Sequence, residues 1–264
     1  MGIRGERYVG VVNASPIVTS ERDGHVVVAQ LRRPPHNFFS TEMIRSLAGV
    51  LEAADHDDEC RVVVVCAEGK NFCAGADFSA SGPVTSTTDL YAAAVRLFRT
   101  QKPVIAAVQG AAIGGGLGLA LAADFRVVAP EARFSANFAR LGFHHGFGLS
   151  ITLPRVVGTQ RAAELLYTGR RIDGEEALKI GLADRIAPLN DLMPAAMELA
   201  ADIAGSAPLA VESIRATLRG DLADRVEAAT HREAMEQARL RVTADFAEGT
   251  RAMAERRDPD FHRG

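Results

Sequence analysis

Three consecutive glycines, Gly114–Gly116, stand between an apolar run of strand length and a segment rich in alanine and leucine. Pro103–Val108 predicts a strand before them, and the residues up to Asp124 predict a helix after them. Glycines in a row lose much backbone entropy on folding and offer no side chains to pack, so this junction must need bare backbone. A helix that begins there presents free N–H donors and the positive end of its dipole, which suit an oxygen that gains negative charge during a reaction.

Two other interpretations of this stretch remain open from the sequence. In the first, the glycines only let a strand and a helix pack closely. In the second, the stretch crosses a membrane, because no charged residue lies between Lys102 and Asp124 and the run is just long enough to span a bilayer. The triple glycine and the polar Gln109 argue against a span, and no second comparable segment exists. We therefore expect no membrane-spanning helix.

Strand-like and helix-like segments alternate through the first two thirds of the chain. Val26–Leu31, Arg61–Cys66 and Phe125–Val128 are expected to be strands. Helical spacing recurs over Thr41–Ala54 and Leu90–Arg99. This alternation predicts an α/β fold with crossover connections.

The last part of the chain has a different character. We expect an α/β core over residues 1–190, which opens with a short strand within Tyr8–Val18, and an all-helical region over 191–264. Breaks are expected near Pro208, Gly220 and Gly249. Because an apolar stripe on a helix usually buries against something, this region is expected to act as a lid or an oligomer contact. The stripe consists of Ile203, Leu209, Val211, Ile214 and Leu218.

Charge and cysteine content exclude several classes of protein. A net charge of −3 gives no general attraction to nucleic acid. The three cysteines form no metal-spaced pair and are too few for a disulfide framework, which favours a reducing compartment. The first ten residues lack the apolar core of a signal peptide, so we expect a cytoplasmic location.

Four motifs, in this order and spacing, resemble those of the crotonase superfamily, the enoyl-CoA hydratase/isomerase group. They cover roughly residues 25–190. In sequence they read RPPHN at 33–37, NFCAGAD at 71–77, PVIAAVQG at 103–110 continuing through GGG to AD at 123–124, and LPRVVG at 153–158 with the LYTGRRI and GLAD segments that follow.

The resemblance implies a spiral of ββα units, trimers that often pair into hexamers, and an acyl-CoA thioester as ligand, with a role in fatty acid metabolism. It implies that the backbone N–H groups of Ala76 and Gly115 hold the thioester oxygen, and that no metal or other cofactor is needed. The remaining residues that would line the acyl-CoA path are Pro35, His36, Asn37, Cys73, Ala74, Gly75, Asp77 and Gly114.

The sequence departs from the hydratase pattern at both catalytic positions. The hydratases of the superfamily use two glutamates, which fall here on Gly118 and Phe138. Residues 132–163 contain no Asp or Glu at all, so no neighbour in sequence replaces them. Since a shared water needs a general base and a general acid, ordinary hydration should be slow or absent. Gly118, Phe138 and Phe143 would line the acyl pocket instead.

Two adjacent histidines, His144 and His145, stand in the region that the family uses for catalysis or acyl recognition. A histidine in an apolar pocket can move protons near neutral pH, and His145 is our first candidate for a base. The alternative is that both only bond backbone carbonyls and shape the pocket. His36 is a further candidate, with loop ordering as its alternative role. Asp124 falls at a position that looks structural.

Three hypotheses for the function follow. The first is an acyl-CoA lyase or isomerase with a non-standard proton carrier, working through an oxyanion-stabilised thioester enolate. The second is a protein that binds acyl-CoA without catalysis. The third is a hydrolase of a non-CoA β-diketone on the same fold. The acyl group cannot be read from the sequence.

Overall fold

The computed structural model describes residues 13–14, 17–76 and 86–264 of the chain. A seven-stranded sheet forms its centre, and the strand pairs from β3 onward are all parallel. Across the sheet, the strands are β1 (Asn13–Ala14), β2 (Val18–Asp23), β3 (Val26–Leu31), β4 (Val62–Ala67), β5 (Val104–Val108), β7 (Phe125–Val128) and β10 (Arg185–Ile186). A second sheet contains β6 (Ala111–Ile113), β8 (Arg133–Ser135) and β9 (Ile172–Asp173).

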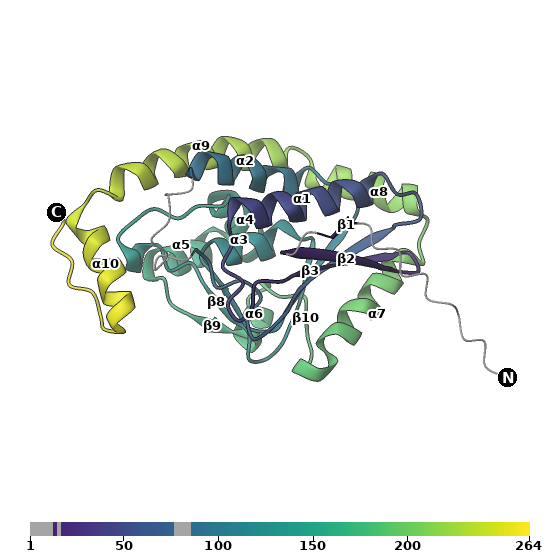
Figure 1. Ribbon diagram of the computed structural model, residues 1–264, viewed down its shortest axis with the longest axis horizontal. Coiled ribbons are helices and arrows are strands. Elements are labelled where there is room, and N and C mark those ends of the chain that lie inside the picture. The colour runs from purple at the N-terminus through teal and green to yellow at the C-terminus, as the bar shows by residue number, and fades with distance from the viewer. Residues whose placement is uncertain (1–12, 15–16, 77–85) are drawn as a thin grey trace.

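The helices follow the strands and then take over the chain (Figure 1). Those of the α/β part are α1 (Thr41–Asp55), α2 (Thr87–Phe98), α3 (Gly115–Ala122), α4 (Leu149–Val157), α5 (Thr159–Thr168) and α6 (Gly174–Lys179), with a 3-10 turn η1 (Ala139–Leu141). After the 3-10 turn η2 (Leu189–Asp191) come α7 (Leu192–Ala204), α8 (Pro208–Arg219), α9 (Leu222–Leu240) and α10 (Ala244–Glu255).

The predicted α/β fold is confirmed, and its repeating unit is two strands followed by a helix. In each unit the first strand enters the large sheet and the second enters the small one: β5 and β6 precede α3, and β7 and β8 precede η1 and α4. An earlier unit has β4 in the large sheet and a single bridge from Cys73 to Ala112 at the edge of the small one. The chain therefore winds as a spiral of ββα units.

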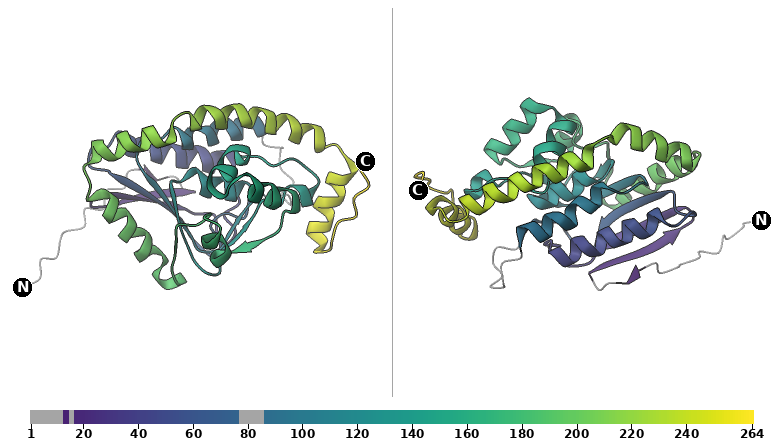
Figure 2. Two further views of the ribbon diagram at one scale, coloured as in Figure 1. Left: turned by 180° about the vertical axis from the view of Figure 1, so that it is seen from behind. Right: turned by 90° about the horizontal axis from the view of Figure 1, so that it is seen from above.

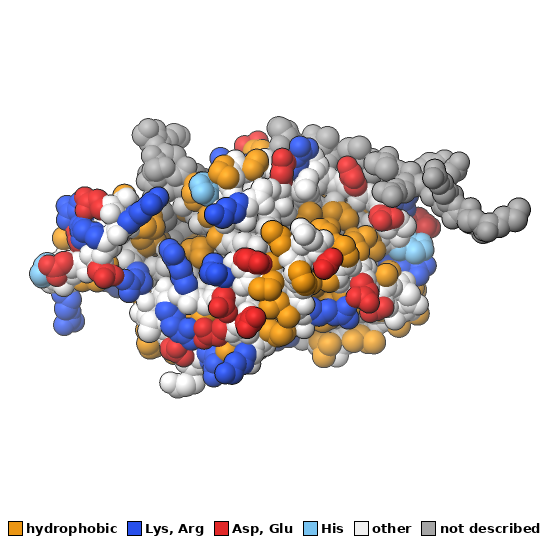
Figure 3. Space-filling view, turned by 90° about the horizontal axis from the view of Figure 1, so that it is seen from below, with side chains coloured by type: hydrophobic (Ala, Val, Ile, Leu, Met, Phe, Trp, Pro, Cys, Tyr) orange, Lys and Arg blue, Asp and Glu red, His pale blue; other side chains and the backbone are white. Residues whose placement is uncertain are grey.

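Both faces of the large sheet are covered, which explains why its strands read as continuous apolar runs. Along β4, Val63 and Val65 join the core under α1, α2 and α3, whereas Val62 and Val64 join a smaller core under α7. Figure 2 shows the two helical layers and, from above, α9 running beside α2. On the face seen from below, hydrophobic side chains gather between charged ones (Figure 3).

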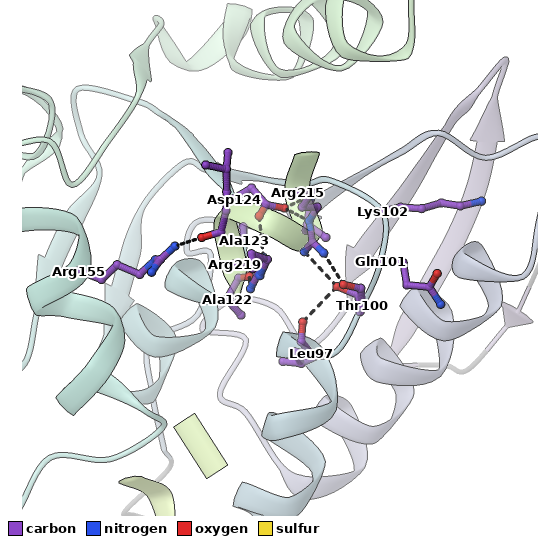
Figure 4. Close-up of polar contacts among 12 residues, drawn as sticks. Leu97, Thr100, Gln101, Lys102, Ala122, Ala123, Asp124, Arg155, Arg215 and Arg219 are labelled. Carbon is purple, nitrogen blue, oxygen red and sulfur yellow. Dashed lines mark hydrogen bonds and ion pairs between the residues drawn. The ribbon is translucent and has the colours of Figure 1, made fainter. Parts of the chain in front are cut away.

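Asp124 ties the C-terminal helices to the sheet (Figure 4). It ends α3, and its carboxylate accepts hydrogen bonds from Arg215 Nε at 2.8 Å and from Arg219 Nη1 at 2.6 Å. It also accepts from the backbone N–H of Val104 at 2.9 Å, at the start of β5. Arg215 in turn donates to the carbonyl of Thr100. Asp124 therefore has the structural position that the sequence indicates.

The expectation of helices alone after residue 190 agrees with the described elements, but one boundary within them was wrong. Gly249 lies inside α10 and not at a break. A side chain there would meet the backbone of Leu141 at 2.6 Å, so the glycine serves close packing of α10 against η1. The chain breaks instead at Arg241–Thr243. Most of the expected first strand, Tyr8–Val18, lies outside the described residues.

None of the helices that the structure describes is long and apolar enough to cross a membrane. The stretch that raised this question is instead divided between β5, β6 and the eight-residue α3.

Candidate functional site

The two backbone segments that carry the predicted oxyanion donors are hydrogen-bonded to each other in parallel. Cys73 donates its N–H to Ala111 O at 2.8 Å, and Ile113 donates its N–H to Cys73 O at 3.1 Å. This register pairs Cys73 with Ala112. Beyond this bridge the chain turns at Gly114 into α3, and Gly116 packs against the carbonyl of Cys73, so the start of α3 stays close to the segment that ends at Ala76.

Neither amide of this pair has an acceptor among the described residues. Gly115 is the first residue of α3, where backbone N–H groups have no partner within the helix. Gly114, by contrast, donates its N–H to Ser135 O at 2.8 Å. Within the described part of the chain, neither Ala76 N–H nor Gly115 N–H donates to another backbone or side-chain group. Two unpaired backbone donors, of which Gly115 N–H stands at a helix N-terminus, can bind an oxyanion.

The glycines around this pair are also needed for close packing. A Cβ at Gly116 would lie 2.0 Å from Cys73 O, and one at Gly75, whose φ is +92°, would lie 2.8 Å from Ile113 O. The interpretation in which the glycines let a strand and a helix pack closely is therefore confirmed, and the oxyanion-donor interpretation stays a prediction.

The loop before α1 braces this arrangement. His36 O accepts a hydrogen bond from Ala74 N at 2.9 Å, and Phe39 N donates to Gly75 O at 3.0 Å. The fully buried Asn37 side chain accepts from Arg33 N and donates to Glu68 O and Asn71 O. Its polar atoms are thus occupied in holding the loop.

The other residues predicted for the acyl-CoA path differ in what they can offer. The Pro35 and His36 side chains are exposed, and His36 Nδ1 lies 3.2 Å from Asn71 Nδ2. The Cys73 thiol is completely buried, so only the backbone of Cys73 lies at the site. Asp77 lies outside the described residues.

Two phenylalanines pack against α3, the helix that begins with Gly115. A Cβ at Gly115 would be 2.2 Å from Cε1 of Phe39, and one at Gly118 would be 2.7 Å from Cβ of Phe147. The two rings are themselves in contact, with centroids 5.9 Å apart. Phe147, which has a φ of +61°, thus fills the space into which a side chain at position 118 would extend.

The predicted acyl-pocket residues Phe138 and Phe143 form a second aromatic group. Their centroids lie 5.4 Å apart, and Phe143 packs edge-on against Phe246 of α10 at 5.1 Å. Phe138 reaches back to the triple glycine, since a Cβ at Gly114 would be 3.5 Å from its ring. Aromatic contacts therefore run from Gly114 through Phe138 and Phe143 to the last helix.

The two histidines stack on one another, with ring centroids 4.1 Å apart, and have different partners. His144 Nδ1 lies 2.7 Å from the carbonyl of His145. His145 Nε2 lies 2.8 Å from Oγ of Ser150, and both side chains are only partly buried. Burial, with His144 as a further cause, lowers the pKa of His145 to about 4, so its imidazole is neutral at physiological pH.

Ser150 leads to a buried carboxylate that the sequence analysis missed. Its hydroxyl donates to Oε1 of Glu233 at 2.7 Å. Glu233 lies on α9 and is 1% exposed, and it also accepts the N–H groups of Gly148 at 2.9 Å and Ser150 at 3.1 Å. Burial raises the pKa of its carboxyl group above the ordinary value. A carboxylate does therefore approach this region, although none lies near it in sequence.

A signal for Glu233 was present in the spacing of α9. The buried residues Val226, Thr230, Glu233 and Gln237 recur every three or four positions along one face of this helix. Three polar residues on a buried stripe need partners, and Gln237 finds one in the carbonyl of His144 at 2.9 Å. Across the described residues, no group of three or more His, Cys, Asp or Glu side chains is arranged to hold a metal ion.

Comparison with known proteins gives consistent matches over almost the whole chain. The sequence model of the enoyl-CoA hydratase/isomerase family matches residues 21–264. A probable enoyl-CoA hydratase of Mycobacterium tuberculosis, EchA12, is 38% identical over 252 residues, which cover 88% of this chain and 87% of the relative. The enoyl-CoA hydratase EchA19 of the same organism is 32% identical over 268 residues, covering 96% of this chain and 99% of the relative.

Solved structures give the same result. A crystal structure of an enoyl-CoA hydratase/isomerase from Pseudoalteromonas atlantica superposes with a TM-score of 0.82 at 31% identity, covering 93% of this chain and 100% of that chain.

Proposed function

The chain belongs to the enoyl-CoA hydratase/isomerase family, and on that basis we propose that it binds an acyl-CoA thioester and forms its enolate. In this proposal the thioester oxygen accepts hydrogen bonds from the N–H groups of Ala76 and Gly115. His145 removes a proton from the α carbon. The acyl chain extends along Phe138 and Phe143. No cofactor beyond the CoA of the substrate is required.

The single observation that carries this proposal is the pair of unpaired amides. In the described structure, Ala76 and Gly115 have backbone N–H groups without a protein acceptor, on segments held in register by the Cys73–Ala112 bridge. Donors that are fixed before substrate binds need no reorganisation as charge develops on the oxygen, and removing one such donor costs roughly 100- to 1,000-fold in turnover.

Ordinary hydration does not fit the same residues. By the resemblance of the motifs, the family's two glutamates fall on Gly118 and Phe138, and Phe147 fills the space beside Gly118. We expect crotonyl-CoA hydration well below about 10 per second, a typical enzyme turnover, because each missing acid–base group commonly contributes about a hundredfold or more. Hydration at an ordinary enzymatic rate would refute the assignment of these positions.

Enolate formation can be tested without knowing the product. The protein is incubated with a panel of saturated, enoyl- and aryl-CoA thioesters in D₂O, and deuterium uptake at the α carbon is followed by mass spectrometry. Calorimetry with the same thioesters, free CoA and the free acids measures affinity. We expect thioesters to bind more tightly than free acids, and at least one to exchange its α proton.

A matched pair of variants at position 115 isolates the backbone donor. Gly115→Pro removes the N–H at the first helical position, where proline is well tolerated. Gly115→Ala keeps the N–H but introduces the same contact with Phe39. We expect proline to slow exchange roughly 100-fold or more relative to alanine. Equal rates would exclude this amide as a donor.

Other outcomes identify the alternative functions. Tight thioester binding without exchange for any substrate would indicate a protein that binds acyl-CoA without catalysis. No binding of CoA or its thioesters at millimolar concentration, with cleavage of a β-diketone, would indicate the hydrolase.

We further propose that the protein assembles as a trimer or hexamer in the cytoplasm. The exposed apolar residues Leu209, Ile214 and Leu218 of α8 support an additional contact. Light scattering that shows only monomer at micromolar concentration would contradict this assembly.

A further inference from the structure

We propose that His145, Ser150 and Glu233 form a proton relay, in which His145 takes the substrate proton and Glu233 of the C-terminal helix stores its equivalent. This inference rests on the proposed function, because it assigns the destination of the α proton. It adds to that function a buried acid supplied by α9.

The hydrogen bonds around Glu233 fix the direction of the relay at rest. Its two carboxylate oxygens accept from three donors: Gly148 N, Ser150 N and Ser150 Oγ. A serine hydroxyl has one proton to donate, and here Glu233 receives it. While Glu233 is ionised, Ser150 Oγ must therefore accept from His145, which assigns the proton of the neutral imidazole to Nε2. His145 Nδ1 is left with a lone pair that can accept a proton.

Proton transfer along this chain is balanced and leaves no charged imidazole. The C–H bond at the α carbon breaks, its electron pair passes into the enolate, and the proton goes to His145 Nδ1. Nε2 then gives its proton to Ser150 Oγ, which gives its own to Glu233 Oε1. The product state has neutral His145 with its proton on Nδ1 and a neutral Glu233. The reverse sequence returns a proton to the substrate.

The surroundings favour this distribution of charge. Burial raises the pKa of Glu233 and lowers that of His145, so the proton is more stable on the carboxylate than on the imidazole. His144 is the titratable group that lowers the pKa of both members of the pair, and Tyr91 of α2 lies near enough that Glu233, after burial, raises its pKa while Arg241 lowers it. Within the described residues, no Lys or Arg forms an ion pair with Glu233.

Glu233 also has a structural role, which the test must separate from the relay. The helix α4 has no side-chain cap of its own, and Glu233 caps it by accepting the N–H groups of Gly148 and Ser150. The third contact, with the Ser150 hydroxyl, is not needed for capping. Replacing that hydroxyl therefore interrupts the relay and leaves the cap in place.

The variants are Ser150→Ala, which removes the hydroxyl, and Ser150→Thr, which retains it. Thr152→Val is a matched control, because it removes a different buried hydroxyl from the same helix. With the best exchanging thioester, we expect Ser150→Ala to lower the rate about 100-fold, the lower end for a general acid–base group, while KM changes less than about twofold. Ser150→Thr should retain most of the rate, and Thr152→Val should retain all of it.

The pH profile gives a readout that a purely structural role would not move. When Glu233 is protonated it donates to Ser150, which then donates to His145 Nε2 and leaves the proton on Nδ1, so the base is blocked. Wild-type activity should fall as the pH drops through the raised pKa of Glu233. In Ser150→Ala this link is lost, so the acid limb should move down toward about 4, the value of His145 itself.

The tautomer of His145 can be measured without substrate, which separates failure of the relay from failure of the proposed function. Nitrogen-15 NMR of the free protein should show the proton on Nε2 at neutral pH and on Nδ1 once Glu233 is protonated. A proton on Nδ1 at neutral pH would overturn the relay, even where acyl-CoA binds and exchanges. An unchanged rate and acid limb in Ser150→Ala would also overturn it. Absence of thioester binding would refute the proposed function instead.

Discussion

The contact between Gly118 and Phe147 gives a direct test of how the acyl end of the site is closed. Gly118→Ala adds one methyl group, whose carbon would lie 2.7 Å from Cβ and 2.8 Å from Cδ1 of Phe147. Both distances are well below ordinary carbon–carbon contact, so Phe147 or α3 must shift. A matched control is available in Gly49 of α1, where an added Cβ has no neighbour within 4 Å.

The expected size of the effect follows from two opposing contributions. Glycine to alanine inside a helix stabilises a protein by about 1 kcal/mol through helix propensity. Forcing a methyl group into a packed core costs about 1–3 kcal/mol. Gly49→Ala should therefore gain about 1 kcal/mol, whereas Gly118→Ala should lie about 1–3 kcal/mol below it. At about 2–4 °C per kcal/mol for a chain of this size, the two melting temperatures should differ by roughly 2–12 °C.

Urea unfolding and thermal melts of the two variants measure this difference. The double variant with Phe147→Gly, compared with each single variant, should show coupling, because removing the phenylalanine side chain makes room for the methyl group. If Gly118→Ala matched Gly49→Ala within about 0.5 kcal/mol, the space beside α3 would be free. Phe147 would then leave room for a side chain at position 118.

Asp124→Ala should lower the free energy of unfolding in urea by about 3–5 kcal/mol, because it leaves the largely buried Arg215 and Arg219 without their carboxylate. The control Asp224→Ala changes a side chain that is 73% exposed, so it should lower the free energy of unfolding by less than about 1 kcal/mol. Equal losses in the two variants would contradict the structural role of Asp124. Burial raises the pKa of Cys60 and Cys66 to about 11 and that of Cys73 to about 12, so a thiol reagent at pH 8 should label none of them in the native protein and all three in guanidinium chloride. Rapid labelling of any thiol in the native state would show that the core opens.

The parts of the fold that the sequence predicts well are those where pattern and burial agree. Val26–Leu31 is a strand with the predicted bounds, and the helix over Thr41–Ala54 extends by a single residue. The short strands β6, β8 and β9 were not predicted, because two or three residues carry no periodicity and their pairing is set by distant segments.

The candidate site likewise contains residues that the sequence points to and one residue that it does not. The proposed donors Ala76 and Gly115 are implied by the resemblance of two local glycine motifs to those of the family, and the structure adds the bridge that joins their two segments. Glu233 could not be assigned to the site in advance, because 83 positions separate it from Ser150 and only the packing of α9 against α4 brings them together. The sequence reveals at most that a polar residue lies on a buried stripe of α9.

Glu233 on α9 caps α4, so the candidate site is complete only after α9 has been synthesised and has packed against α4. The ribosome makes the glycine segments and the histidine loop first and α9 only near the end of the chain. Until α9 docks, the N–H groups of Gly148 and Ser150 lack the Glu233 carboxylate as their acceptor. His145 then contacts Ser150, but Ser150 has no carboxylate to which it can donate. A chain that ends before α9 would thus keep the two amides proposed to polarise the thioester carbonyl. It would lack the carboxylate proposed to receive the proton from the substrate. In the proposed relay the last helices are part of the chemistry, and a minimal version of this protein made by trimming them should lose proton exchange.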